Sequence, residues 1–340
     1  MTTYKGINGF AVQSVASDPS PLDEGQVWYN NASYAFKLAT VTTSGTWASG
    51  GNVNTARQSP GGAGANSSSF IFFGGYTTAY LGTSESYNGT SWTPTPSLNT
   101  ARNQLGGAGT QTAALGFGGT NGSNLTATEI WNGSSWTSNP TGLNTGRRAL
   151  GGTGTQTAGL AVGGADANPQ GNAVESWGGS SWTSVTSLNV GQRSGVAGTQ
   201  TAAITTAVGT VGMPGPGAAV TQTWNGSVWT SLPAAPFPTS APGLGDLSIF
   251  GTSTQALATA GSDFSTNVTY APSAVFNGST WTSSTALPTA RGSAGSSGGS
   301  SFSDSLLASG TAGAPSYSLL NSTVEWVGPG VPTTKTITTS

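Results

Sequence analysis

The 340-residue sequence contains no cysteine and no histidine. The chain therefore has no disulfides, no imidazole or thiolate metal ligands, no cysteine nucleophile and no histidine general base. Carboxylate catalysis remains possible in principle. We expect neither a metal nor a cofactor.

Charged residues are also scarce, with 9 Lys and Arg against 11 Asp and Glu and a net charge of -2. A nucleic-acid-binding surface needs clustered cations that neutralise phosphates, so this function is excluded. No apolar run approaches the roughly 18 residues that span a bilayer, which excludes membrane insertion by a helix. Residues 1–6 lack the charged and then apolar build of a signal peptide. We expect synthesis and folding in a cytoplasm.

Glycine, by contrast, is abundant, with 53 positions, and only 35% of the residues are hydrophobic. Each glycine inside a helix costs about 1 kcal/mol relative to alanine, so a helical fold is disfavoured. Thr, Ser, Val and aromatic residues between glycine-rich turns favour short β-strands.

A motif of the form Asn-Gly-x-x-Trp-Thr recurs along the chain at nearly even spacing. Its tryptophans are Trp92, Trp136, Trp182, Trp229 and Trp281, and a weaker copy ends at Trp47. Successive tryptophans are 45, 44, 46, 47 and 52 residues apart. A period in this range indicates a propeller or a solenoid. The Asn-Gly pair predicts a two-residue hairpin turn, in which both central residues take positive φ.

The second repeat shows the expected layout most clearly. Four short strands are predicted near 105–109, 113–117, 127–131 and 135–137, with a glycine pair after the second strand. This order of an apolar strand, a glycine pair, an aromatic residue and a later tryptophan recurs over residues 47–327 and resembles the Kelch motif. The resemblance implies four-stranded blades of an all-β propeller.

Six such units are present, and the last one lacks its own Asn-Gly-x-x-Trp copy. We therefore expect a six-bladed propeller over residues 41–330, in which the Trp47 strand lies beside the Glu325–Trp326 strand and closes the ring. Closure of this kind removes exposed sheet edges. The alternative is seven blades, with an additional blade built from residues 1–47.

Two sets of charged residues follow the repeat. One comprises Glu85, Glu129, Glu175 and Glu325, and the other comprises Arg57, Arg102, Arg147, Arg193 and Arg291. We interpret them as structural ion pairs, either within a repeat or between neighbouring repeats. An arginine clamp for an anion is the alternative, but one arginine per blade is too regular for a single asymmetric site. The repeated tryptophans are likewise expected to pack between blades rather than to stack on sugars.

The first 40 residues do not repeat, and they are expected to contain a hairpin across Asn30–Ser33. The phrase Gly-Gln-Val-Trp-Tyr-Asn, from Gly25, followed by Phe-Lys-Leu, from Phe36, is similar to segments near the starts of bacteriophage tail, fibre and other virion proteins, especially marine ones. This similarity implies that residues 1–40 attach the propeller to other virion proteins. The alternative is a hairpin packed against the propeller. Residues 331–340 are expected to form a C-terminal tail.

The resulting hypothesis is a non-enzymatic structural protein of a phage virion, made in the host cytoplasm. The alternative is a lectin that binds a host surface glycan through loop aromatics, namely Tyr76, Tyr80, Phe264, Tyr270 and Tyr317. An enzyme would need paired carboxylates, and the non-repeating candidates Asp166, Asp246, Asp263 and Asp304 show no pairing in the sequence. We therefore assign no catalytic residues. Homo-oligomer formation stays open.

Overall fold

The computed structural model describes residues 4–5, 11–19, 26–41, 45–166, 171–193, 195–207, 220–237, 244–259, 261–263, 268–296, 301–313, 318–329 and 332–337. The chain divides into two compact units, one made of Met1–Thr46 with Val327–Ser340 and one made of Trp47–Trp326. Among the described residues there is no helix that could cross a membrane.

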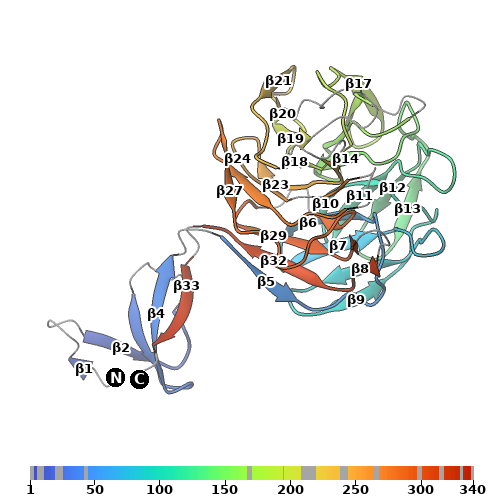
Figure 1. Cartoon of the computed structure of the whole chain (residues 1–340). Coiled ribbons are helices and arrows are strands. Elements are labelled where there is room, and N and C mark those ends of the chain that lie inside the picture. The colour runs from blue at the N-terminus through green and yellow to red at the C-terminus, as the bar shows by residue number, and fades with distance from the viewer. Residues whose placement is uncertain are drawn as a thin grey trace. The chain divides into compact units, whose positions relative to one another are not determined.

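The larger unit is a β-propeller, and its described part contains six four-stranded sheets (Figure 1). In order from the inner strand, these blades are β6 (Gly61–Asn66), β7 (Ser69–Phe73), β8 (Ser84–Tyr87) and β9 (Trp92–Thr95); β10 (Gly106–Thr110), β11 (Ala113–Phe117), β12 (Thr128–Trp131) and β13 (Trp136–Asn139); β14 (Gly151–Gly154), β15 (Gly159–Val162), β16 (Val174–Trp177) and β17 (Trp182–Val185); β18 (Val196–Gly198), β19 (Ala203–Ala207), β20 (Val220–Trp224) and β21 (Trp229–Leu232); β23 (Ser248–Thr252), β24 (Gln255–Thr259), β26 (Ser273–Phe276) and β27 (Trp281–Ser284); and β28 (Gly295–Ser296), β29 (Asp304–Ala308), β32 (Thr323–Val327) and β5 (Thr46–Gly50). Two-stranded sheets join β22 (Leu244–Gly245) to β25 (Ser262–Asp263) and β30 (Thr311–Ala312) to β31 (Ser318–Leu319).

The last blade takes its outer strand from the beginning of the propeller. β5 carries Trp47 and pairs with β32, which carries Trp326, and the two rings lie 5.0 Å apart. The inner strands contact one another in the order β6, β10, β14, β18, β23, β28 and again β6. The predicted pairing of the Trp47 strand is therefore confirmed. The six blades and the five-stranded sheet of the other unit make seven sheets of four or more strands among the described residues.

Glycine is required where the inner strands approach one another. A Cβ added at Gly107 would lie 2.2 Å from the carbonyl oxygen of Gly62, and one at Gly152 would lie 2.3 Å from that of Gly107. No side chain fits at such distances, so the crowding of inner strands around the axis explains part of the high glycine content.

The Asn-Gly turns differ from the prediction. Trp131 pairs directly with Trp136, so the loop has four residues rather than two. Gly133 has φ of 92°, whereas Asn132 is absent from the residues with positive φ. The Asn132 side chain instead accepts hydrogen bonds from the backbone N–H groups of Ser134 (3.0 Å) and Ser135 (2.9 Å). Asparagine is used here because its side chain caps the loop.

Aromatic residues fill the space between blades. Trp136 in the second blade lies 4.7 Å from the Phe73 ring in the first, and Trp182 in the third lies 4.8 Å from Phe117 in the second. Both tryptophans are buried. This geometry agrees with the interpretation of the repeated tryptophans as inter-blade packing.

The smaller unit is a five-stranded sheet in the order β1 (Tyr4–Lys5), β2 (Ala11–Val15), β3 (Val27–Asn30), β4 (Ala35–Val41) and β33 (Pro332–Ile337). The β3–β4 hairpin turns at residues 31–34, close to the predicted place. The expected C-terminal tail is instead partly a strand, because Pro332–Ile337 pairs with β4 over six residue pairs. Thr333, Thr334, Thr336 and Ile337 are β-branched, and β-branched residues are enriched in strands.

Candidate functional site

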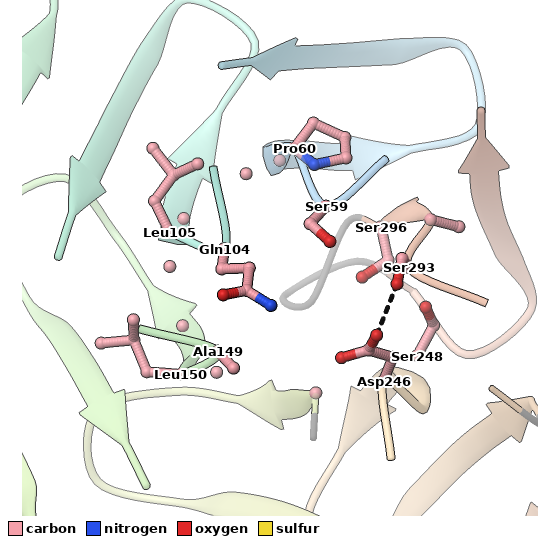
Figure 2. A pocket seen from close by; sticks show the side chains of 18 of the residues that line it. Ser59, Pro60, Gln104, Leu105, Ala149, Leu150, Asp246, Ser248, Ser293 and Ser296 are labelled. Carbon is pink, nitrogen blue, oxygen red and sulfur yellow. Dashed lines mark hydrogen bonds between the residues drawn. The ribbon is translucent and has the colours of Figure 1, made fainter. Parts of the chain in front are cut away.

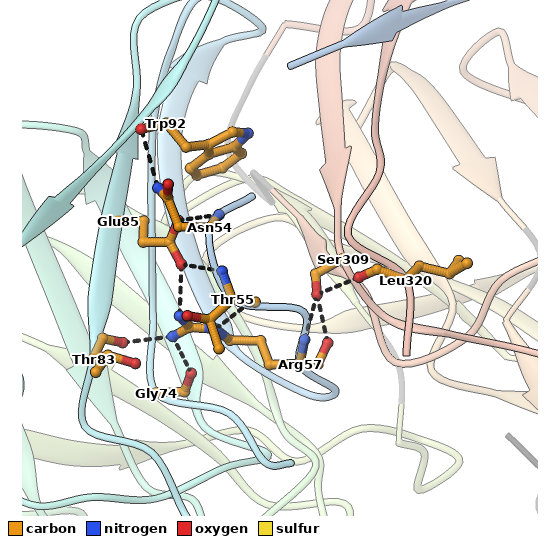
Figure 3. A network of polar contacts seen from close by, with 9 residues as sticks. All are labelled: Asn54, Thr55, Arg57, Gly74, Thr83, Glu85, Trp92, Ser309 and Leu320. Atoms are coloured by element: carbon orange, nitrogen blue, oxygen red, sulfur yellow. Dashed lines mark hydrogen bonds and ion pairs between the residues drawn. The ribbon is translucent and has the colours of Figure 1, made fainter. Parts of the chain in front are cut away.

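Three blades contain the same buried ion pair, and each pair lies within one repeat (Figure 3). Arg57 donates to Glu85 at 2.7 Å, Arg102 donates to Glu129 at 2.5 Å, and Arg147 donates to Glu175. All six side chains are at most 3% exposed. The choice between pairing within a repeat and pairing between repeats, which the sequence left open, is thereby resolved for these blades.

The first pair shows what the network does. Besides Arg57, Glu85 accepts hydrogen bonds from the backbone N–H groups of Asn54 (2.8 Å) and Thr55 (3.2 Å), and Arg57 also donates to the carbonyl oxygens of Gly74 and Thr83. Burial lowers the pKa of Arg57, and the Glu85 charge opposes this shift. Because these groups satisfy one another, the network fixes the loop before each inner strand and offers no free charge to a ligand.

Glu325 and Arg193 do not belong to these two sets, contrary to the prediction. Glu85, Glu129 and Glu175 stand two residues before their aromatic partner, and Val324 takes that place in the last blade. Glu325, one position later, accepts a 2.6 Å hydrogen bond from the Tyr87 hydroxyl.

Arg193 is shifted by one residue in the same way. The repeat position of the arginines can be recognised by a backbone hydrogen bond, in which a glycine N–H of the preceding blade donates to the carbonyl oxygen at that position. Gly119 donates in this way to Arg147, and Gly164 donates to Gln192. Gln192 therefore occupies the arginine position of the fourth blade. The glutamate position is also neutral there, since Gln222 bonds to the backbone N–H and C=O of Val190 at 3.1 and 2.9 Å.

Arg291 occupies the arginine position of the last blade without a carboxylate. It is 2% exposed and donates to the carbonyl oxygens of Ser309 (3.3 Å) and Ser322 (3.1 Å) and to the Ser322 hydroxyl (3.0 Å). Burial lowers the pKa of Arg291 to about 10. The surrounding carbonyl groups hold this guanidinium in place of an ion pair.

Five of the six blades each contribute one residue in a left-handed backbone conformation to the mouth of the central channel, and the corresponding position of the fourth blade lies outside the described residues. Ser59, Gln104, Ala149, Asp246 and Ser293 have φ between 52° and 55°. Each lies just before an inner strand, two residues after the arginine position in the blades where that position is defined. Non-glycine residues adopt this conformation rarely, and such strain occurs preferentially at functional sites.

Backbone hydrogen bonds link these residues around the axis. The N–H of Ser59 donates to Ser293 (2.7 Å), that of Gln104 to Ser59 (2.8 Å) and that of Ala149 to Gln104 (2.8 Å). The backbone groups in this part of the ring are therefore occupied, which leaves the side chains to define the chemistry of the channel mouth.

A cavity of about 100 Å³ opens at this mouth (Figure 2). Hydroxyl, amide and carboxyl side chains line the cavity together with apolar residues. The polar members are Ser59, Gln104, Asp246, Ser248, Ser293 and Ser296, and the apolar ones include Pro60, Leu105, Leu150, Val196 and Leu247. A site of this composition can hold several water molecules or a small polar group.

Asp246 is the carboxylate of this cavity. Its Oδ2 accepts a 2.5 Å hydrogen bond from the Ser293 hydroxyl (Figure 2). Burial raises the pKa of Asp246, although the Ser293 bond and the nearby Arg193 charge oppose the shift. Burial and the neighbouring Arg148 lower the pKa of Arg193. Ion pairs among the described residues do not include Asp246, so its charge is only partly compensated.

The predicted ligand aromatics lie elsewhere. Tyr76 and Tyr80 form an edge-to-face pair 5.3 Å apart, and Tyr270 packs against the apolar cluster that contains Phe276. None of these three lines the cavity, and Phe264 and Tyr317 lie outside the described residues. The channel mouth was not predicted from the sequence, although the variable positions two residues after the arginines mark it.

The four candidate catalytic acids are not brought together at this cavity. Asp246 lines it, whereas Asp166, Asp263 and Asp304 do not. Within the described ranges there is also no cluster of three or more Asp or Glu residues suited to a metal ion.

Comparison with known proteins supports the fold alone. No family model matches the chain, and no curated protein matches it. A solved structure titled "Structure of YjhT" is 12% identical, with a TM-score of 0.62, over 84% of this chain and 99% of that one. At this identity the likeness shows a β-propeller.

Proposed function

We propose that this protein is a non-enzymatic structural component of a bacteriophage virion, which displays its propeller on the particle. The observation that carries the proposal is the separate sheet formed by both ends of the chain, in which β33 pairs with β4. Strands from both ends of the chain pair in this sheet, so the unit is held together by its own hydrogen bonds and is suited to attachment. Two parts of the phage-like segment lie in the hairpin of this module, Val27–Asn30 in β3 and residues 36–38 in β4, and Gly25 lies outside the described residues.

The propeller contributes stability rather than chemistry in this proposal. Six of its buried charged side chains form the three Arg–Glu ion pairs, and its cavity holds one of the four candidate acids. A glycosidase needs two carboxylates about 5–10 Å apart. We also propose that the blades are Kelch-like, because the strand order and the glycine and tryptophan positions follow that motif.

Mass-spectrometric analysis of purified particles from the source tests the location. The chain is expected among the particle proteins. Particles that incorporate other structural proteins but not this one would contradict the proposal. A version without residues 1–46 and 327–340 is expected to stay off the particle, while the propeller alone keeps its unfolding temperature.

A second candidate function is the binding of a host surface glycan. The observation that favours it is the polar cavity at the channel mouth, where the regular repeat is broken by side chains that differ between blades. A glycan array probed with the full chain tests this function. Absence of binding by protein that assembles on particles would leave only the structural role.

A further inference from the structure

We propose that the channel mouth binds a neutral sugar through two adjacent hydroxyl groups, with Asp246 as the main acceptor. The inference deepens the second candidate function and rests on it. The proposed sugar-binding site is thereby moved from the loop aromatics to the channel mouth, which the sequence did not indicate.

Unused hydrogen-bonding capacity converges on the cavity. The Asp246 carboxylate uses one oxygen for Ser293, and its other oxygen has no hydrogen-bond partner among the described residues. The side chains of Ser59, Gln104 and Ser248 likewise have no hydrogen-bond partner within the described part of the chain, and all three line the cavity. Figure 2 shows Gln104 and Ser59 extending toward the side on which Asp246 and Ser293 lie. Ser248 is buried, whereas Ser59, Gln104 and Asp246 are half-buried, so a ligand in the cavity can satisfy groups that water reaches only in part.

The charges around the cavity favour a neutral ligand. An anion would meet the partly compensated carboxylate of Asp246. A cation would be repelled by Arg193, which does not line the cavity but is close enough to Asp246 to act on its pKa. Hydroxyl groups can both donate and accept, so they suit a carboxylate, an amide and serine hydroxyls at once. Neighbouring hydroxyls can donate to the free Asp246 oxygen and accept from Gln104.

The fixed backbone supports such recognition. The backbone hydrogen bonds through Ser59, Gln104 and Ala149 fix the backbone positions from which the side chains extend before the ligand arrives. Pro60, Leu105 and Leu150 also line the cavity, so the C–H groups of a sugar ring can contact apolar atoms there. A pre-formed site loses less conformational freedom on binding.

The test is an NMR titration of the ¹⁵N-labelled full chain with the methyl glycosides of mannose, galactose, glucose and fucose. At least one is expected to shift the Gln104 side-chain amide and the backbone amides of Ser59 and Ser293. The permethylated form of the same glycoside keeps the ring but lacks hydroxyl donors, and it should bind at least tenfold more weakly. Asp246→Asn should also weaken binding at least tenfold, whereas the control Tyr80→Ser should leave it unchanged.

Three results would overturn the inference: no response to any of the four glycosides by folded protein, equal binding of the permethylated form, or sensitivity to Tyr80→Ser instead of Asp246→Asn. In the last case, glycan binding stands and only its site is wrong. Incorporation of the chain into particles is measured separately, so failure here is distinguishable from failure of the structural role.

Discussion

Tyr87 and Glu325 are separated by 238 residues, yet the Tyr87 hydroxyl donates a 2.6 Å hydrogen bond to Oε1 of Glu325. Tyr87 lies on β8 of the first blade and Glu325 on β32 of the last, so the bond crosses the seam where the ring closes. The backbone N–H of Gly51 donates to the same hydroxyl at 3.1 Å. A Cβ at Gly50 would lie 2.6 Å from the Glu325 oxygen, which explains a glycine beside this contact.

Tyr87→Phe is expected to destabilise the propeller. The change removes a hydrogen bond to a charged group and leaves the Gly51 N–H without this acceptor, which should cost about 1–3 kcal/mol. Thermal unfolding measures the effect. Tyr80→Phe is the control, because no hydrogen bond of the Tyr80 hydroxyl is recorded among the described residues, and it should unfold like the unaltered chain. Equal unfolding temperatures for the two variants would contradict a role for the seam contact.

The same contact predicts a pH dependence. Burial, followed by the hydrogen bond to Glu325, raises the pKa of Tyr87 to about 12, from an ordinary value near 10. The folded state then holds this proton more tightly than the unfolded state, so the stabilisation is present below about pH 10 and is lost as the pH rises toward 12. Ultraviolet titration of tyrosinate should show one group fewer ionising near pH 12 in Tyr87→Phe. A Tyr87 that ionises near pH 10 in the folded protein would contradict this prediction.

The buried ion pairs predict strong coupling between their members. Glu129→Gln leaves Arg102, whose side chain is 0% exposed, as a buried cation without a counter-charge. The expected loss is about 3–5 kcal/mol. The double change Arg102→Gln with Glu129→Gln copies the two neutral residues that stand at these positions in the fourth blade, Gln192 and Gln222, and it should be less destabilising than Glu129→Gln alone. Unfolding of four proteins measures the coupling, namely the unaltered chain, Glu129→Gln, Arg102→Gln and the double variant, and additive losses would show that the pair does not act as a unit.

Asp246→Asn is expected to leave the fold intact at pH 7 and to stabilise it slightly. Because burial raises the pKa of Asp246, ionisation of this group opposes folding as the pH rises above its ordinary pKa near 4. Asparagine keeps an acceptor for the Ser293 hydroxyl without the charge. The unfolding temperature of the variant should therefore equal or exceed that of the unaltered chain at pH 7, and the difference should shrink toward pH 3. A clear destabilisation at pH 7 would instead assign the carboxylate a stabilising role.

Removal of residues 328–340 is expected to weaken the smaller unit and spare the propeller. The truncation deletes β33, which supplies the partner strand along Phe36–Val41 of β4. Limited proteolysis should then cut within residues 26–41 sooner than in the full chain. The unfolding temperature of the propeller should not change. Equal protease resistance would show that β33 is dispensable.

Much of the propeller could be predicted from the sequence because its repeat is local. Short strands, glycine pairs and tryptophans recur in one order, and an unpartnered copy at Trp47 indicates how the last blade is completed. The members of the three Arg–Glu pairs were predicted correctly, because each stands at a constant distance from an aromatic residue or a glycine of its repeat. Glu325 and Arg193 were misassigned because each lies one position from its set. For Glu325, which is on a strand, one residue places the side chain on the opposite face.

The sequence by itself determined the repeat, the strand content and the absence of histidine and cysteine chemistry, since all of these depend on composition and local spacing. Only the tertiary structure decided which glutamate meets which arginine, that Pro332–Ile337 joins the β4 strand, and that Asp246 shares a cavity with Gln104 and Ser293. These contacts join residues that are distant in the chain. Ring closure and strand pairing bring them together, and no local pattern encodes their distances.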